Sequence, residues 1–201
     1  SLNIWRTMMI WMGGMGIIVL AVAILPLLGV GGSQLFRAEM AGPMKDAKLT
    51  PRIEETAKGL WLVYFALTAA CAGAYKLAGM EGADSLMHAF TTVGLGGFSS
   101  HDASFAYFDS PAIEAVAVVF MLFSAVNFTV HFLAFRGRSL VAYGRDPEAR
   151  RVALWAGAAT FLVGVHLWGQ GIYPDLVTAM RHAVFNVVSV GTTTGYSSTD
   201  Y

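Results

Sequence analysis

The sequence predicts an all-α integral membrane protein in which spanning helices are interleaved with short re-entrant loops. Of its 201 residues, 56% are hydrophobic and only 13% are charged, whereas soluble domains carry roughly 25% charged residues. Four uncharged segments approach or exceed the length of about 20 residues that a helix needs to cross a hydrocarbon core. Two shorter apolar segments, each interrupted by glycines, follow the second and fourth of these spans.

The four predicted spans contain no Asp, Glu, Lys or Arg, and they cover residues 8–28, 59–75, 115–135 and 152–174. A membrane-embedded enzyme would need a convergent acid, base or metal set at this depth, so we expect no enzymatic activity. A single cysteine, Cys71, excludes an internal disulfide and offers no metal-binding spacing. The formal net charge is zero, and no basic excess indicates nucleic-acid binding.

The basic residues predict the orientation of the spans. Ten of the thirteen Lys and Arg residues lie in the connection between the first and second spans and in the loop at 136–151. By the positive-inside rule both segments are cytoplasmic, so the spans alternate in direction and the two interrupted segments lie on the outer face. Irregular backbone at membrane depth is tolerated only inside protein or beside water, which predicts that both interrupted segments are re-entrant.

The two interrupted segments contain a repeat. "GLGGFSSHD" (94–102) and "GTTTGYSSTD" (191–200) align at a constant offset of 98 residues, with Gly97 matching Gly195. An apolar stretch precedes each copy, at 83–92 and 175–190, and we expect it to form a short pore helix. A period of this length is too long for a solenoid and indicates duplicated subdomains, whose loops meet at a common centre if the units are parallel repeats.

The residue types in this repeat suit a dehydrated cation. A selectivity filter replaces the water shell with backbone carbonyls, and the alternating backbone handedness that turns successive carbonyls inward is easy for glycine. Hydroxyls of the threonines at 192–194 can add ligands or brace the strand. The negative C-terminal end of each pore helix would face the ion. Asp102 and Asp200 either cap a turn or concentrate cations at a pore mouth, and their matched placement favours the mouth.

Three stretches, "NVVSVGTTTGYSSTDY", "HAFTTVGLGGFSSHD" and "WRTMMIWMGGMGIIVLAVAILPLL", resemble the Trk/Ktr/HKT superfamily of potassium transporters, most closely its bacterial TrkH type. The resemblance covers the whole chain and implies helix, pore loop, helix units of the potassium-channel-like type, four of which surround one pore in that family. It implies that the chain is an internal fragment of such a transporter. Residues 1–28 would close a first unit, 29–56 form a cytoplasmic connection, 57–135 form a complete second unit with its pore loop at about 83–102, and 152–201 begin a third.

The resemblance implies potassium transport through a channel-like pore, with K⁺ held by the backbone carbonyls of Gly97 and Gly195. It implies no covalent cofactor and a multi-pass location in the lipid of a bacterial inner membrane. It also implies a homodimer and cytosolic nucleotide-binding regulatory subunits as partners. The selectivity-filter residues carried over are Leu95, Gly96, Gly97, Phe98, Thr193, Thr194, Gly195 and Tyr196.

Several alternatives stay open at the level of sequence. Gly13, Gly14 and Gly16 suit close helix packing better than a conduction hinge. Asn127 and His131, four residues apart in one predicted span, are candidates for pore lining or for hydrogen bonds between helices. A cation-coupled secondary transporter with discontinuous helices is the alternative function. Topology distinguishes the two, because a filter loop returns to its starting side whereas a broken helix continues across the membrane.

Overall fold

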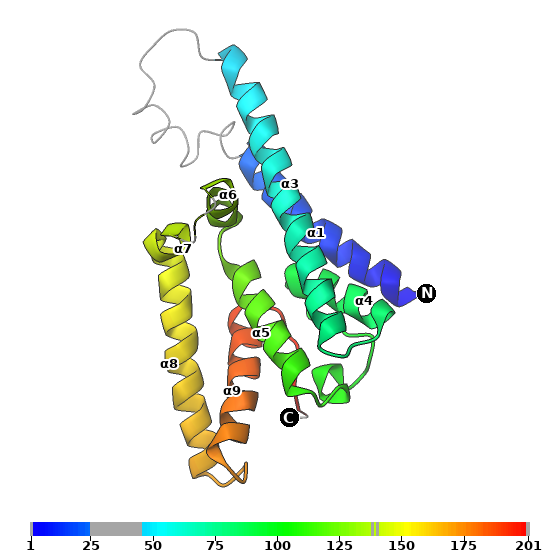
Figure 1. The fold of residues 1–201 in the computed structure, drawn as a ribbon, viewed down its shortest axis with the longest axis vertical. Helices are drawn as coiled ribbons and strands as arrows, with labels where there is room; N and C mark the ends of the chain where they lie inside the picture. The colour runs from blue at the N-terminus through cyan, green and yellow to red at the C-terminus, as the bar shows by residue number, and fades with distance from the viewer. Residues whose placement is uncertain (1, 25–45, 138, 140, 200–201) are drawn as a thin grey trace.

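The computed structural model describes residues 2–24, 46–137, 139 and 141–199, and every element within these ranges is helical (Figure 1). The elements are α1 (Leu2–Ile24), α3 (Asp46–Leu77), α4 (Gly82–Val93), the 3₁₀ helix η1 (Ser104–Tyr107), α5 (Pro111–Ala125), α6 (Phe128–Gly137), α7 (Val141–Arg145), α8 (Pro147–Gly169) and α9 (Leu176–Gly191). The predicted all-α fold is therefore confirmed.

The first helices pack around α4. Where α1 crosses α3, the Trp11 indole donates to the Thr68 hydroxyl at 3.0 Å, and the Tyr64 hydroxyl donates to the Trp11 carbonyl at 3.0 Å. A Cβ on Gly14 would lie 2.9 Å from the Tyr64 hydroxyl oxygen and 3.4 Å from the Gly94 Cα. This close approach confirms the packing role at Gly14, whereas a Cβ on Gly13 or Gly16 would have no neighbour of this kind within 4 Å.

Two helices among the described residues are long and apolar enough to cross a membrane by themselves. They are Lys58–Leu77 within α3 and Pro147–Gly169, which is α8. Helix α3 begins at Asp46, so residues 46–56 of the predicted connection are helical, whereas 29–45 lie outside the described residues. Helix α8 begins before its predicted span because the Asp146 carboxylate accepts the Ala149 N–H at 2.7 Å and caps the helix.

The predicted span over 115–135 is not one continuous helix. The chain forms α5 and α6, which are bent by 97° at the break between them. Val126 has an extended backbone, and the Asn127 side chain accepts the Thr129 N–H at 2.9 Å at the start of α6. Asn is a favoured N-cap because it replaces a missing backbone partner. The bend therefore follows from a capping residue inside an apolar run.

Helices α8 and α9 form a hairpin that packs against α5 (Figure 1). Glycines allow the approach, because a Cβ on Gly164 would overlap Met180 and one on Gly191 would overlap Trp155. The Arg181 guanidinium on α9 donates to both carboxylate oxygens of Glu114 on α5, at 2.8 and 2.7 Å. Glu114 is 3% exposed, so this bidentate pair is the polar link between the two helices.

We predict that Glu114→Gln lowers the free energy of unfolding by about 2 kcal/mol, because hydrogen bonds to charged groups contribute roughly 1.5–3 kcal/mol. The measurement is an SDS titration of the purified full-length protein in mild detergent. Asp109→Asn is the matched control, since Asp109 contacts the same guanidinium at 3.3 Å but its side chain is 86% exposed. The control should unfold like wild type, and equal losses in the two variants would contradict the assignment.

Candidate functional site

Each of the short helices α4 and α9 is followed by a segment that runs back along the helix it leaves. We call residues 94–102 the first return segment and residues 192–199 the second. In the first, the Thr91 hydroxyl donates to the Phe98 carbonyl at 2.8 Å, and the Ser100 hydroxyl donates to the Asp84 carboxylate at 2.7 Å. Because Asp84 lies in the first turn of α4, the chain has returned to the side from which the helix started.

The second return segment repeats these contacts at the same offset of 98 residues. The Ser189 hydroxyl donates to the Tyr196 carbonyl at 2.7 Å, as Thr91 does to Phe98. The His182 ring nitrogen and the Ser198 hydroxyl are 2.9 Å apart, in the positions of Asp84 and Ser100. Both segments are therefore re-entrant in form, as the sequence predicts.

Both short helices end in the same hydrogen-bonded motif. The N–H groups of the second and third residues after each helix turn back to carbonyls in its last turn, which is the Schellman arrangement with one left-handed residue. Leu95 and Thr193 are that residue, with φ of 51° and 61°. The four bonds are Leu95 to Thr92 at 3.2 Å, Gly96 to Thr91 at 2.8 Å, Thr193 to Val190 at 3.0 Å and Thr194 to Ser189 at 2.9 Å.

A second left-handed residue follows two positions later in each segment. Gly97 has a φ of 65° and Gly195 a φ of 92°. The helix cap explains the backbone of Leu95 and Thr193, but it does not require a left-handed residue at the glycines. Left-handed conformations cost about 1–2 kcal/mol for residues with a Cβ. The alternation predicted from the glycines is thus present in both segments.

The two return segments lie in contact. A Cβ on Gly97 would overlap the carbonyl oxygen of Thr194 in the second segment. Beyond the first segment, the Phe105 N–H donates to the Ser197 carbonyl at 3.0 Å, and the Ser197 N–H donates to the Ser104 hydroxyl at 3.3 Å. The structure therefore brings together the residues at 95–98 and 193–196.

Side chains around the second glycine differ in exposure. The hydroxyls of Thr192 and Thr194 are buried and 2.7 Å apart, whereas Thr193 is exposed. Two of the three threonines thus brace the segment. Tyr196 is 2% exposed, but Phe98 at the matching position is 44% exposed, with the Arg6 guanidinium 4.6 Å from its ring centroid.

The first return segment is held at its far end by an acidic group that the sequence analysis missed. Asp84 accepts the Ser100 hydroxyl and lies 2.9 Å from a ring nitrogen of His101, whose ring stacks on Tyr107 at 3.5 Å between centroids. Partial burial of the Asp84 carboxyl raises its pKa, but the hydrogen bonds from His101 and Ser100 outweigh this effect, so the pKa lies below its usual range. Asp102 is exposed, and Asp200 lies outside the described residues.

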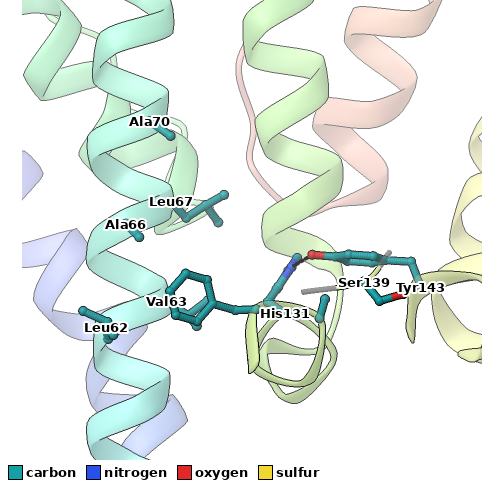
Figure 2. A pocket seen from close by; sticks show the side chains of 10 residues that line it. Leu62, Val63, Ala66, Leu67, Ala70, His131, Ser139 and Tyr143 are labelled. Atoms are coloured by element: carbon teal, nitrogen blue, oxygen red, sulfur yellow. Dashed lines mark hydrogen bonds between the residues drawn. The ribbon is translucent and has the colours of Figure 1, made fainter. Parts of the chain in front are cut away.

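Asn127 and His131 lie at the break between α5 and α6. The ring of His131 is 2.8 Å from the Phe123 carbonyl and 2.7 Å from the Tyr143 hydroxyl. His131 and Tyr143 line a cavity of about 400 Å³ together with α3 residues such as Leu67. Figure 2 shows these side chains. Both polar side chains therefore satisfy backbone or side-chain groups at the bend.

Sequence reasoning also missed the hydroxyls of Thr91 and Ser189, which hold the two return segments. The signal was present, because these residues keep the 98-residue offset of the glycines. Asp84 and His182 keep the same offset with different chemistry. The repeat extends into the helices and includes the side chains that contact the segments.

The chain is similar to known cation transport proteins over its whole length. Residues 1–201 match the family model TrkH, described as a cation transport protein. A Trk system potassium uptake protein TrkH from Halomonas elongata is 54% identical over 197 residues, which is 98% of this chain and 41% of that protein. The Escherichia coli K12 protein of the same name is 50% identical, over 96% of this chain and 40% of its own length.

The fold agrees with a solved structure. The crystal structure of the potassium transporter TrkH from Vibrio parahaemolyticus superposes with a TM-score of 0.85 at 44% identity, covering 98% of this chain and 39% of that one. The chain thus spans about 40% of the length of the relatives it matches. On the family match and these identities, the chain belongs to the TrkH family of cation transport proteins.

Proposed function

We propose that the protein containing this chain transports potassium across a membrane through a channel-like pore, and that the two return segments contribute part of its selectivity filter. The main support for this proposal is the left-handed backbone at residues 95 and 97, which is repeated at residues 193 and 195. The relatives are named as potassium uptake proteins, which supports potassium as the transported ion.

The proposed ion ligands are backbone carbonyls of residues 95–97 and 193–195. The carbonyls of Gly97 and Gly195 are the principal ligands in this proposal. A filter works by offering carbonyl oxygens in place of the hydration shell. The carbonyls of Phe98 and Tyr196 accept hydroxyls from Thr91 and Ser189, so in this proposal they anchor the strand while the preceding carbonyls face the ion. The α4 and α9 C-termini add a negative partial charge near the same place.

The alternative of a secondary transporter with discontinuous helices is less well supported. Such a helix continues to the opposite side after its break, whereas both return segments run back along the helix that precedes them. The true break, between α5 and α6, lies in a different part of the fold from the repeated glycines.

The proposed setting is a bacterial inner membrane crossed several times by a chain longer than this one. A homodimer and cytosolic nucleotide-binding regulatory subunits are the proposed partners, with lipid around the apolar helices. Transport would be passive and without chemical catalysis. Asp102 is a proposed attractor of cations at the outer mouth, because it is exposed at the end of the first return segment.

We predict that Gly97→Ser and Gly195→Ser abolish growth rescue, or admit sodium, in a potassium-uptake-deficient bacterial strain at limiting external potassium. Each substitution imposes about 1–2 kcal/mol of left-handed strain. Gly97→Ser also forces its Cβ into the Thr194 carbonyl, whereas Gly195 has no atom within 4 Å of a Cβ. The measurement is growth together with potassium uptake by the full-length protein, and Gly97→Ser should be the more severe variant.

Gly157→Ser is the matched control, because Gly157 is helical, has no neighbour within 4 Å and has no left-handed backbone. It should transport like wild type at equal membrane abundance. If both filter variants also transport like wild type, the return segments are not the filter.

We further predict that Ser189→Ala raises the KM for potassium about 5-fold while Ser189→Thr keeps it near wild type. Alanine leaves the buried Tyr196 carbonyl without its hydroxyl donor, a loss of about 1–3 kcal/mol. Threonine restores the donor, and Thr91 is the natural example at the matching position. The measurement is the concentration dependence of potassium uptake, and equal KM values for alanine and wild type would contradict the anchoring role.

A further inference from the structure

We infer that Tyr196, which belongs to the second return segment, is a positioning residue for the first. This inference rests on the proposed filter function and adds a coupling between its two described segments. Tyr196 lies directly after Gly195, yet its hydroxyl contacts α4, the helix that carries the first segment. A side chain of one repeat thus reaches the support of the other.

The ring of Tyr196 is fixed in a buried site formed by the other repeat. It is 2% exposed, its centroid is 4.5 Å from that of Phe105, and it is 6.3 Å from the His88 ring. Its hydroxyl contacts the Thr91 hydroxyl, lies 3.1 Å from the Thr92 hydroxyl, and is 3.3 Å from the His88 carbonyl. The site leaves the hydroxyl no access to bulk water.

The number of protons available identifies the donor and the acceptor in each of these hydrogen bonds. Each hydroxyl carries one proton, and Thr91 uses its own toward the Phe98 carbonyl at 2.8 Å. When that bond is formed, the short Thr91 contact is satisfied only if Tyr196 donates to Thr91 rather than to the more distant His88 carbonyl at 3.3 Å, and Tyr196 then accepts from Thr92. The Tyr75 hydroxyl, 2.8 Å from Thr92, completes the order as its donor.

The result is a chain of hydroxyls that ends on the backbone of the first return segment. Its members in order are Tyr75, Thr92, Tyr196, Thr91 and the Phe98 carbonyl. Donation by Tyr196 polarises the Thr91 hydroxyl and strengthens its bond to that carbonyl, because buried hydrogen bonds in series reinforce one another. Phe98 directly follows Gly97, so the bond fixes the peptide beside a proposed ion ligand.

The second return segment supports the first through Tyr196, but the first does not support the second through the matching residue. Phe98 occupies the position of Tyr196 in the other repeat but has no hydroxyl, and its ring is partly exposed beside Arg6. The donor that holds the Tyr196 carbonyl is Ser189. Loss of the Tyr196 hydroxyl should therefore disturb the geometry at Gly97 more than the geometry at Gly195.

The test is a kinetic comparison of Tyr196→Phe with wild type in the full-length protein, by potassium uptake with and without competing sodium. Removing one buried hydroxyl bond is expected to raise the KM for potassium about 5-fold, equivalent to about 1 kcal/mol. We expect weaker exclusion of sodium and a maximal rate within about 2-fold of wild type. Thr91→Val should give the same change, and the double variant should add no more than about 2-fold, because both substitutions interrupt one chain of bonds.

Two controls separate positioning from general damage. Thr91→Ser keeps the hydroxyl and should retain wild-type KM. Tyr143→Phe removes a hydroxyl from the His131 contact near the break between α5 and α6, and it should also leave KM and sodium exclusion unchanged.

The outcomes distinguish this inference from the proposed function. If Tyr196→Phe has wild-type KM and sodium exclusion while Gly195→Ser is inactive, the positioning role is wrong and the filter assignment stands. If the glycine variants transport like wild type, the filter assignment itself is wrong. If Tyr196→Phe does not accumulate in the membrane, the Thr91→Val and Thr91→Ser pair decides, and equal KM values for the two overturn the positioning role.

Discussion

The structure depends on the need to satisfy backbone polar groups away from water. In a membrane each unpaired N–H or carbonyl costs several kcal/mol, so irregular chain requires partners within the protein. The N–H groups of the return segments donate to carbonyls at the helix ends, and one carbonyl in each segment accepts from the hydroxyl of Thr91 or Ser189. Thr91 donates to the Phe98 carbonyl of the first segment, and Ser189 donates to the Tyr196 carbonyl of the second. The irregular backbone of both segments thereby finds partners within the protein.

The same constraint explains polar residues that are not part of the glycine repeat. At the bend between α5 and α6, Asn127 accepts a free N–H and His131 contacts the carbonyl of Phe123. Tyr64 and Trp11 likewise join α1 to α3 through a backbone carbonyl. In this chain, polar side chains within apolar runs mark a break between two helices and a crossing of two helices.

Sequence alone predicted the elements whose signals are local. The short helices at 82–93 and 176–191 begin and end within one residue of the predicted 83–92 and 175–190, because apolar runs bounded by glycine, threonine and aspartate define them. The bend at Asn127 was missed because an apolar window of this length fits either one helix or two. The bond from Tyr196 to Thr91 joins residues 105 positions apart, and no periodicity reveals such a contact.

The repeat shows which features of the site depend on backbone and which on side chains. Leu95 matches Thr193, and Gly96 matches Thr194, yet the four bonds of the helix-end motif and the left-handed residues coincide in the two segments. The bond from the Gly195 N–H to the Ser189 carbonyl, at 3.3 Å, is an addition in the second segment. Strain at a non-glycine residue persists only where surrounding contacts determine it, and here the same hydrogen bonds impose it on both leucine and threonine. The carbonyl geometry is therefore insensitive to the side chains in front of it. The side chain after each glycine differs, because Tyr196 carries a hydroxyl that contacts the other repeat and Phe98 has none. That difference makes the two segments unequal while their backbones remain alike.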